Sequence, residues 1–365
     1  MQTLNRYVDQ LSQMWQALRA EGRSARADAG VSRPHQLCEL VALRLGEGKL
    51  EPADYYKLRL YRRGLSFEEK RKYFSNQAIP PSLLGNWAVV AQDKLLTYCV
   101  LNSLGIATPT IHAICHSVRE YGRAVGLKSA SAVAEYLRKE APYPLIAKPI
   151  RGIFSQDVWL LEGYDPAADR LVTTGSSFTP EEFAAHCCQR KTGYLFQELL
   201  RPQEAIRAAI SDRLCTLRVM LRVEDGGPRL TLTTWKISAG GNVADNYWRE
   251  GNLLAKLDQK TGRILHCTTG LGPRYRTVEH HPRTGMPLAG FQVPYYREAV
   301  DLALHASTAF ADIRLQAWDI AITDSGPVPL EVNVVGSLFI PQLLNQKGLW
   351  AGDFRDLVLT YRRSA

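Results

Sequence analysis

Three polar side chains near the C-terminus, Asp319, Glu331 and Asn333, have the types and the spacing of a site for a hard metal ion. They interrupt two apolar strands, which are separated by the turn-forming residues 324–327. In an antiparallel hairpin centred near Ser325, Asp319 faces Glu331 directly, and Asn333 lies two residues further along the same side. A slip of one residue would destroy this pairing.

Two facing carboxylates require a compensating charge. With β-carbons about 5 Å apart, they repel by about 3 kcal/mol at an effective dielectric constant of 20. Oxygen ligands without His or Cys favour Mg²⁺, with Mn²⁺ as an alternative, and so few protein ligands leave coordination positions for phosphate oxygens and water. The alternative interpretation is an ordinary edge hairpin with a solvated polar face.

Other residues have the character of phosphate and nucleotide ligands. Lys148 ends an apolar strand and precedes the loop 151–157, whose backbone amides could surround phosphates. Lys94 follows Asp93, a candidate helix N-cap. The strand 194–200 becomes polar at its end, where its backbone could meet an adenine edge. Each of these features, taken alone, also occurs in proteins that bind no nucleotide.

Basic and amide side chains in the second half of the chain are candidates for the chemical step. Arg218 alternates within an apolar strand and could steady a transferring phosphoryl group, although a structural ion pair explains it equally well. Lys236, Asn246 and Arg249 lie in or beside the glycine-rich segment 238–251, which could reach into a site.

The elements that must position these residues form an α+β pattern. Residues 1–85 read as a helical module that includes a capping box from Ser66 to Glu69. Residues 86–195 and 196–365 mix strands with helices, and we expect two α+β subdomains there.

Composition limits the class of protein. The chain has 365 residues, a formal charge of +9 and seven cysteines without a Cys-x-x-Cys pair, which favours reduced thiols and a cytoplasmic location. No apolar stretch is long enough to span a membrane. Residues 1–85 contain 14 Lys and Arg against nine Asp and Glu. A solvated helical face or a docking surface for an acidic protein partner explains this excess, and we do not expect nucleic acid as a partner.

The order of these residues along the chain resembles the ATP-grasp superfamily from about Asp93 to the C-terminus. The strand-borne Lys148-Pro149 and the Asp319, Glu331-x-Asn333 hairpin carry most of the resemblance. The segments Asp54-Tyr55-Tyr56 and Asp245-Asn246, together with His281 to Gly285, look like the sugar-transfer-associated branch of ATP-grasp proteins. The loop 151–157 departs from the usual pattern, since it has a single glycine where ATP-grasp lids are rich in glycine and serine.

The resemblance implies an ATP-grasp fold, in which two α+β subdomains grip ATP, together with a role for each matching residue. Asp319, Glu331 and Asn333 would hold two Mg²⁺ ions, and Glu204 would bind the ribose hydroxyls. Arg218 and Lys236 would be catalytic, while Asn246 and Arg249 would contact substrate. The residues implied to bind the remaining parts of ATP are Lys94, Lys148, Ser155, Gln197, Glu198, Leu199 and Leu200.

The implied activity is that of a ligase. ATP would phosphorylate a small-molecule carboxylate, and an amine or thiol would attack the acyl phosphate, with release of ADP and phosphate. Positioning and charge neutralisation suffice for such phosphoryl transfer, so no nucleophilic Ser, Cys or His is required. Two alternatives stay open: an ATP-grasp kinase that phosphorylates a hydroxyl group, and a non-catalytic nucleotide-binding partner protein, which the single-glycine loop would suit.

Overall fold

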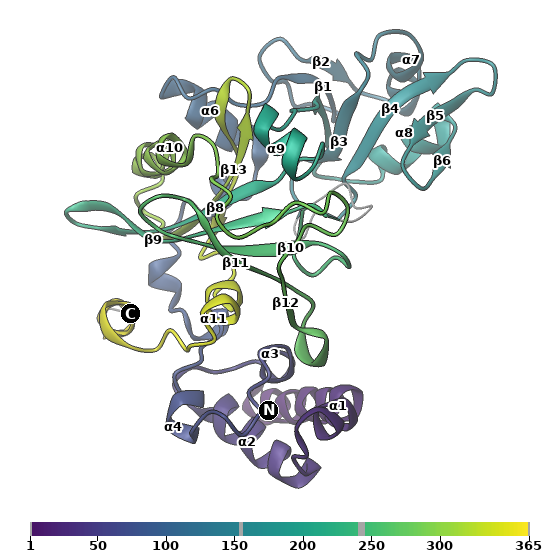
Figure 1. Ribbon diagram of the computed structural model, residues 1–365. Coiled ribbons are helices and arrows are strands. Elements are labelled where there is room, and N and C mark those ends of the chain that lie inside the picture. The colour runs from purple at the N-terminus through teal and green to yellow at the C-terminus, as the bar shows by residue number, and fades with distance from the viewer. Residues whose placement is uncertain (1, 153–155, 240–244, 364–365) are drawn as a thin grey trace.

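The computed structural model describes residues 2–152, 156–239 and 245–363. They form a helical N-terminal region and two β-sheets with helices on their faces (Figure 1). Each sheet has seven strands among these residues. The arrangement is the α+β architecture expected from the sequence.

The helical region consists of one long helix, α1, and several shorter elements, three of which have a side-chain N-cap. The Ser66 hydroxyl accepts a hydrogen bond from Glu69 N, and the Glu69 carboxylate accepts one from Ser66 N, so the predicted capping box is confirmed. The elements of this region are α1 (Gln2–Ala29), α2 (Arg33–Leu45), α3 (Pro52–Lys57), α4 (Phe67–Lys70), η1 (Asn76–Ala78) and η2 (Pro81–Leu83).

The first sheet has the strand order β2-β1-β7-β3-β4-β5-β6. Its core lies against α7 (Ala130–Lys139) and α8 (Pro180–Cys188). The strands are β1 (Ile111–Cys115), β2 (Val125–Leu127), β3 (Leu145–Pro149), β4 (Trp159–Asp165), β5 (Arg170–Thr173), β6 (Ser177–Phe178) and β7 (Tyr194–Glu198).

The second sheet has the strand order β12-β11-β10-β9-β8-β13-β14. The helix α10 (Tyr296–Thr308) packs on this sheet, and its alanines and Tyr296 join the largest core. The strands are β8 (Thr216–Glu224), β9 (Gly227–Ile237), β10 (Leu253–Leu257), β11 (Ile264–Thr269), β12 (Arg276–Val278), β13 (Leu315–Thr323) and β14 (Gly326–Val334).

The remaining helices connect these layers. The Asp93 side chain accepts a hydrogen bond from Leu96 N at 3.2 Å, so the predicted N-cap of α6 is confirmed. These helices are α5 (Ala88–Ala91), α6 (Lys94–Ser103), α9 (Glu204–Ala209), η3 (Gly272–Arg274), α11 (Phe339–Asn345) and α12 (Gly352–Arg363).

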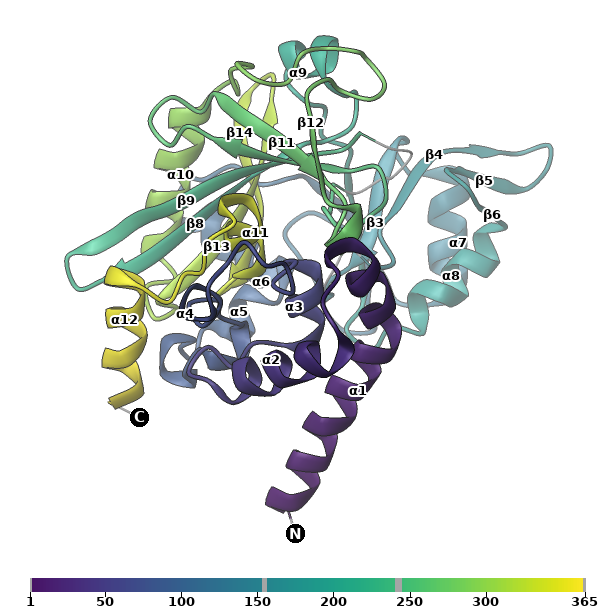
Figure 2. The same cartoon turned by 60° about the horizontal axis from the view of Figure 1, so that its bottom comes forward.

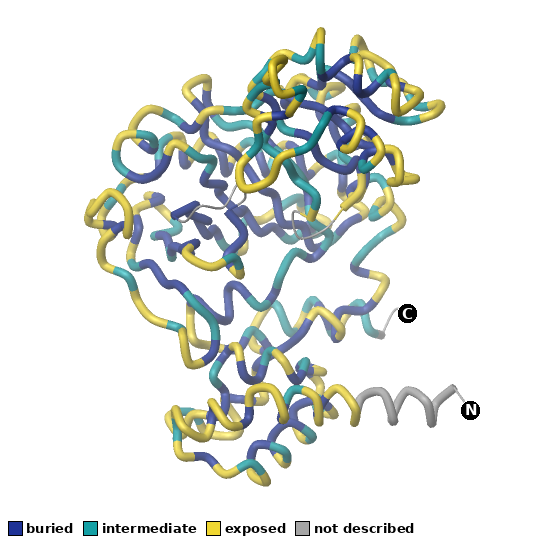
Figure 3. Tube along the Cα trace, turned by 90° about the vertical axis from the view of Figure 1, so that its right-hand side faces the viewer, coloured by how far each residue is buried: buried dark blue, intermediate teal, exposed yellow. Residues whose placement is uncertain are grey.

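Buried segments run through both sheets and continue into the helical region (Figure 3). One apolar core joins Tyr55 and Tyr56 of α3 to Tyr247, Leu254 of β10 and Ile340 of α11. The helical region is therefore packed onto the second sheet through shared core residues. Within the described residues, every helix is too short or too polar to cross a membrane.

Candidate functional site

A cavity of about 870 Å³ lies among β3, β8, β13, β14 and the helical region. It collects ten of the residues that the sequence singled out for nucleotide, metal or substrate. These ten are Lys94, Lys148, Gln197, Leu200, Arg218, Lys236, Asn246, Asp319, Glu331 and Asn333.

The hairpin β13–β14 places Asp319 opposite Glu331, as the sequence predicts. The centre lies between residues 324 and 325, beside the predicted Ser325, but the turn is shorter than the predicted 324–327, because Thr323 pairs with Gly326. A regular ladder from that turn would put Asp319 opposite Leu330. The register instead shifts at Leu330, which has no partner on β13, and this β-bulge restores the Asp319–Glu331 pair.

A hydrogen bond from a side chain of α6 fixes the bulge in place. The Tyr98 hydroxyl donates to the Leu330 carbonyl at 2.9 Å, and the Tyr98 side chain is fully buried. The Lys148 ammonium in turn donates to the Tyr98 hydroxyl at 3.4 Å. One tyrosine thus contacts both the bulge that sets the register of Glu331 and the lysine that ends β3.

We expect Tyr98→Phe to lower the free energy of unfolding by about 1 to 3 kcal/mol, because it leaves the Leu330 carbonyl without its donor. The Mg²⁺ concentration for half-maximal nucleotide binding should rise several-fold as the bulge loosens. Tyr143→Phe is the matched control, since the Tyr143 hydroxyl also donates to a carbonyl, that of Leu137, but in α7 beside the first sheet. An equal Mg²⁺ requirement in the two variants would contradict the role of Tyr98.

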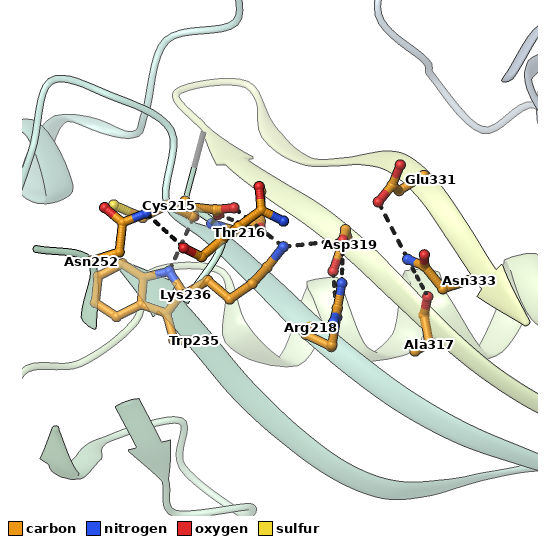
Figure 4. A network of polar contacts seen from close by, with 12 residues as sticks. Cys215, Thr216, Arg218, Trp235, Lys236, Asn252, Ala317, Asp319, Glu331 and Asn333 are labelled. Carbon is orange, nitrogen blue, oxygen red and sulfur yellow. Dashed lines mark hydrogen bonds and ion pairs between the residues drawn. The ribbon is translucent and has the colours of Figure 1, made fainter. Parts of the chain in front are cut away.

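Asp319 is the centre of a buried ion network (Figure 4). Arg218 on the neighbouring strand β8 donates to both Asp319 oxygens, at 2.8 and 2.7 Å. Lys236 on β9 donates to Asp319 Oδ2 at 3.1 Å and pairs with Asp245 at 3.2 Å. Burial alone raises the pKa of Asp319, but the charges of Arg218 and Lys236 outweigh it and hold the pKa well below its usual range.

Asp245 was not among the predicted site residues. It lines the cavity and accepts hydrogen bonds from Thr216 N and Thr216 Oγ1 at 2.7 and 2.6 Å. Its place in the network depends on residue 245, which follows β9, lying beside Thr216 at the start of β8, and spacing along the chain does not contain that information.

The donor set at the hairpin fits magnesium. Glu331 lies in the cavity with no Lys or Arg in ion-pair distance among the described residues. Asn333 Nδ2 points at Ala317 O and Glu331 Oε1, each at 3.4 Å, which leaves its amide oxygen for a cation. The described residues contain no group of three His, Cys, Asp or Glu side chains suited to a metal. The available ligands are therefore the Glu331 carboxylate and the Asn333 amide oxygen, and the third oxygen donor, Asp319, is already bonded to Arg218 and Lys236.

Two lysines supply positive charge to the same cavity. Lys148 is 8% exposed, and burial, assisted by the nearby charge of Lys94, lowers the pKa of Lys148 to about 7. The ammonium also lies over the Tyr98 ring, 5.9 Å from its centroid. An anionic ligand would favour the charged form of Lys148, because it would offset the cost of desolvation.

Several predicted residues are arranged differently from the ten that line the cavity. The Glu198 carboxylate accepts a hydrogen bond from Thr110 N at 2.7 Å. Glu204 begins α9, and its backbone N–H donates to the Asp324 side chain. Leu199 and Arg249 are likewise not among the cavity-lining residues. Ser155 lies outside the described residues.

Gln197 lines the cavity with its Oε1 buried and without a hydrogen-bond partner among the described residues. Its side chain is 4% exposed in all. A buried acceptor of this kind fits a ligand that brings an N–H donor, such as an exocyclic amino group.

Comparison with known proteins identifies relatives of this chain. The model of a family described as sugar-transfer associated ATP-grasp matches residues 74–353. No curated protein sequence matches significantly.

Similar solved structures include several ligases. D-alanyl-alanine synthetase A from Vibrio cholerae is 12% identical with a TM-score of 0.42, over 86% of this chain and 73% of that chain. The L-amino acid ligase from Bacillus licheniformis is 13% identical with a TM-score of 0.35, over 73% of this chain and 45% of that chain. The VanG D-Ala:D-Ser ligase from Enterococcus faecalis is 13% identical with a TM-score of 0.37, over 68% and 53%. This chain spans about half the length of the last two proteins, and likeness at this level says nothing about its substrates.

Proposed function

Because this chain belongs to the sugar-transfer associated ATP-grasp family, we propose that it is an ATP-dependent ligase that joins a small carboxylic acid to an amine. One observation carries the proposal. A single cavity contains two lysines for phosphate, a carboxylate that has no basic partner among the described residues beside an amide oxygen for Mg²⁺, and space for further ligands. The reaction would consume acid, amine and ATP and would release amide, ADP and phosphate.

In this proposal the nucleotide is held by residues 86–195 together with the first residues of 196–365. Lys94 and Lys148 bind phosphate oxygens, while Gln197 and Leu200 contact the base. Asp319, Glu331 and Asn333, from the second half at 196–365, hold one or two Mg²⁺ ions. Bound ATP and Mg²⁺ would supply an activated phosphoryl group and neutralise its negative charge.

Arg218 and Lys236 orient the acid in this scheme. Their side chains are 6% and 5% exposed and are fixed by Asp319 and Asp245, so little rearrangement is needed when an anion approaches. Buried side chains of this kind exclude water from the cavity. This protects an acyl phosphate from hydrolysis until the nucleophile attacks.

Nucleotide affinity should depend on the charge of Lys148. Since the pKa of Lys148 is lowered to about 7, the ammonium is present below this pH and is lost above it, so affinity should fall as pH rises through 7. Lys148→Ala should weaken binding by about 1.5 to 3 kcal/mol at low pH, the loss of a charge-assisted contact. Lys148→Arg keeps its charge and serves as the control for titration of the nucleotide itself. Equal pH profiles of the three proteins, measured by calorimetry, would exclude this role.

The proposal is tested by ADP release in the presence of ATP and Mg²⁺. Pooled carboxylates, pooled amines and both pools together are compared, with mass spectrometry of the products. Release that needs an acid and yields the mass of acid plus amine minus water supports the ligase. Release with an alcohol pool and a stable phosphorylated product would replace it by a kinase, and binding of ATP without stimulation by any pool would replace it by a nucleotide-binding partner protein.

A further inference from the structure

The helical region forms one wall of the cavity. Glu51, Asp54 and Lys57 of α3 and its N-cap line the same space as Lys148 and Glu331. This region was expected to be either a solvated helical face or a docking surface. Neither alternative is tested by the cavity, but part of the charge of this region faces the site.

Hydrogen bonds join this wall of the cavity to the segment that follows β14. Asn76 Nδ2 donates to Gly336 O at 2.7 Å, and Leu338 N donates to Asn76 Oδ1 at 3.2 Å. Gln342 of α11 bonds to both Phe74 N and Phe74 O, at 3.0 and 2.8 Å. Glu331 and the helical region therefore keep a defined relation, because only a few residues separate Asn333 from this anchor.

A second buried network of side-chain hydrogen bonds fixes the position of α3. The Tyr55 hydroxyl donates to Glu39 at 2.6 Å, and Lys70 pairs with the other Glu39 oxygen at 2.6 Å. The Tyr56 hydroxyl donates to Gln36 at 3.0 Å. These bonds orient α3 so that Asp54 faces the cavity.

The charge of this wall suits a cation. The Asp54 side chain is 18% exposed, and its ion pair with Lys57 is long, at 3.8 Å. Glu51 accepts a bond from the neutral Gln77 side chain at 3.1 Å. Among the described residues, Lys57 is the ion-pair partner of Asp54, and Glu51 has no ion-pair partner. Burial raises the pKa of Asp54 to about 6, which shows that its charge is poorly compensated.

A buried acceptor independently points to a ligand that donates hydrogen bonds. Asn246 Oδ1 is buried and has no hydrogen-bond partner among the described residues, while the side chain lines the cavity and is 7% exposed. Trp248, two residues on, lines the cavity with 43% of its surface exposed. An indole face attracts ammonium groups, and an unsatisfied amide oxygen needs an N–H or O–H donor.

We propose that the part of the cavity between α3 and the Asn246–Trp248 segment is the subsite for the amine-bearing acceptor, with Asp54 and Glu51 holding the acceptor in its ammonium form. This inference rests on the proposed function for its reaction, but it predicts amine binding whether or not turnover occurs. The amine must lose a proton before it can attack, and a nearby carboxylate keeps the ammonium close until that happens.

The test is ligand-observed NMR with the full chain, Mg²⁺ and a non-hydrolysable ATP analogue. The probes are a pool of small primary amines and its N-acetylated counterpart. Wild type should bind members of the amine pool, and N-acetylation, which removes the positive charge, should abolish binding. Asp54→Asn should weaken amine binding at least tenfold while leaving affinity for the analogue within twofold.

Glu68→Gln is the matched control, because it removes the same charge from an exposed carboxylate of the helical region outside the cavity. Circular dichroism and thermal unfolding check that Asp54→Asn is folded, and Asp54→Glu should recover part of the affinity. Equal binding of amines and their N-acetylated forms, or unchanged amine binding by Asp54→Asn, overturns the inference. Amines that bind without stimulating ADP release leave the subsite standing and reject the ligase.

Discussion

Glu331→Gln is expected to lower the turnover number about 100- to 1,000-fold, which corresponds to about 2.7 to 4.1 kcal/mol of transition-state stabilisation. Glu331 is the carboxylate of the hairpin without a basic partner among the described residues, so its charge is available to Mg²⁺. Glutamine keeps the shape and removes the charge. The free energy of unfolding should change by less than about 1 kcal/mol, because no buried ion pair is broken.

Steady-state kinetics over a range of Mg²⁺ concentrations measure this effect. Glu162→Gln is the control, since Glu162 is an exposed carboxylate on β4. Turnover of Glu331→Gln at the wild-type rate and with the wild-type Mg²⁺ requirement would exclude the hairpin as the metal site.

The substitution Asp319→Asn should affect stability as well as activity. Asp319 and Arg218 are both nearly inaccessible, at 5% and 6% exposed, and Lys236 also depends on Asp319. Loss of this one charge leaves Lys236 with Asp245 as its remaining ion-pair partner, and Arg218 with no ion-pair partner among the described residues. Breaking a buried pair by removing one member costs about 3 to 5 kcal/mol, so the variant should be strongly destabilised as well as inactive.

Urea unfolding at neutral pH gives the size of this effect. The pKa of Asp319 is lowered from 3.8 in the folded protein, so its contribution is complete above that value and is lost as pH falls through the folded pKa. The difference between wild type and variant should therefore shrink only in strong acid. Asp212→Asn breaks an exposed pair with Arg283 and should cost less than about 1 kcal/mol. Equal losses in the two variants would contradict the prediction for Asp319.

Much of the site could be predicted from the sequence. Its residues either lie close together along the chain or stand at the ends of strands whose apolar pattern is easily recognised. The alternation in the two apolar strands, which the structure places at 315–323 and 326–334, predicted that Asp319 faces Glu331. The strand that ends at Lys148 was visible for the same reason. These local patterns suffice when the partner is the next strand in sequence.

The rest depends on contacts between distant segments. The sequence predicted a repulsion between Asp319 and Glu331, but Asp319 is already neutralised by Arg218, about 100 positions earlier in the chain. Nothing in the spacing shows that β13 lies beside β8. For the same reason, the pattern of residues 1–85 revealed helices but did not reveal that Asp54 faces the cavity.

The bulge at Leu330 divides the hairpin into two parts that can vary separately. Because Tyr98 fixes the strand at that residue, the spacing of Glu331 and Asn333 from Asp319 is set at the base of the hairpin. The tip at residues 324–325 is joined to α9 instead, because Asp324 accepts a hydrogen bond from Glu204 N and pairs with Arg207. An insertion at the tip should cost this contact and leave the ligands in place, whereas a single insertion or deletion between Leu330 and Asn333 would turn the ligands away from the cavity.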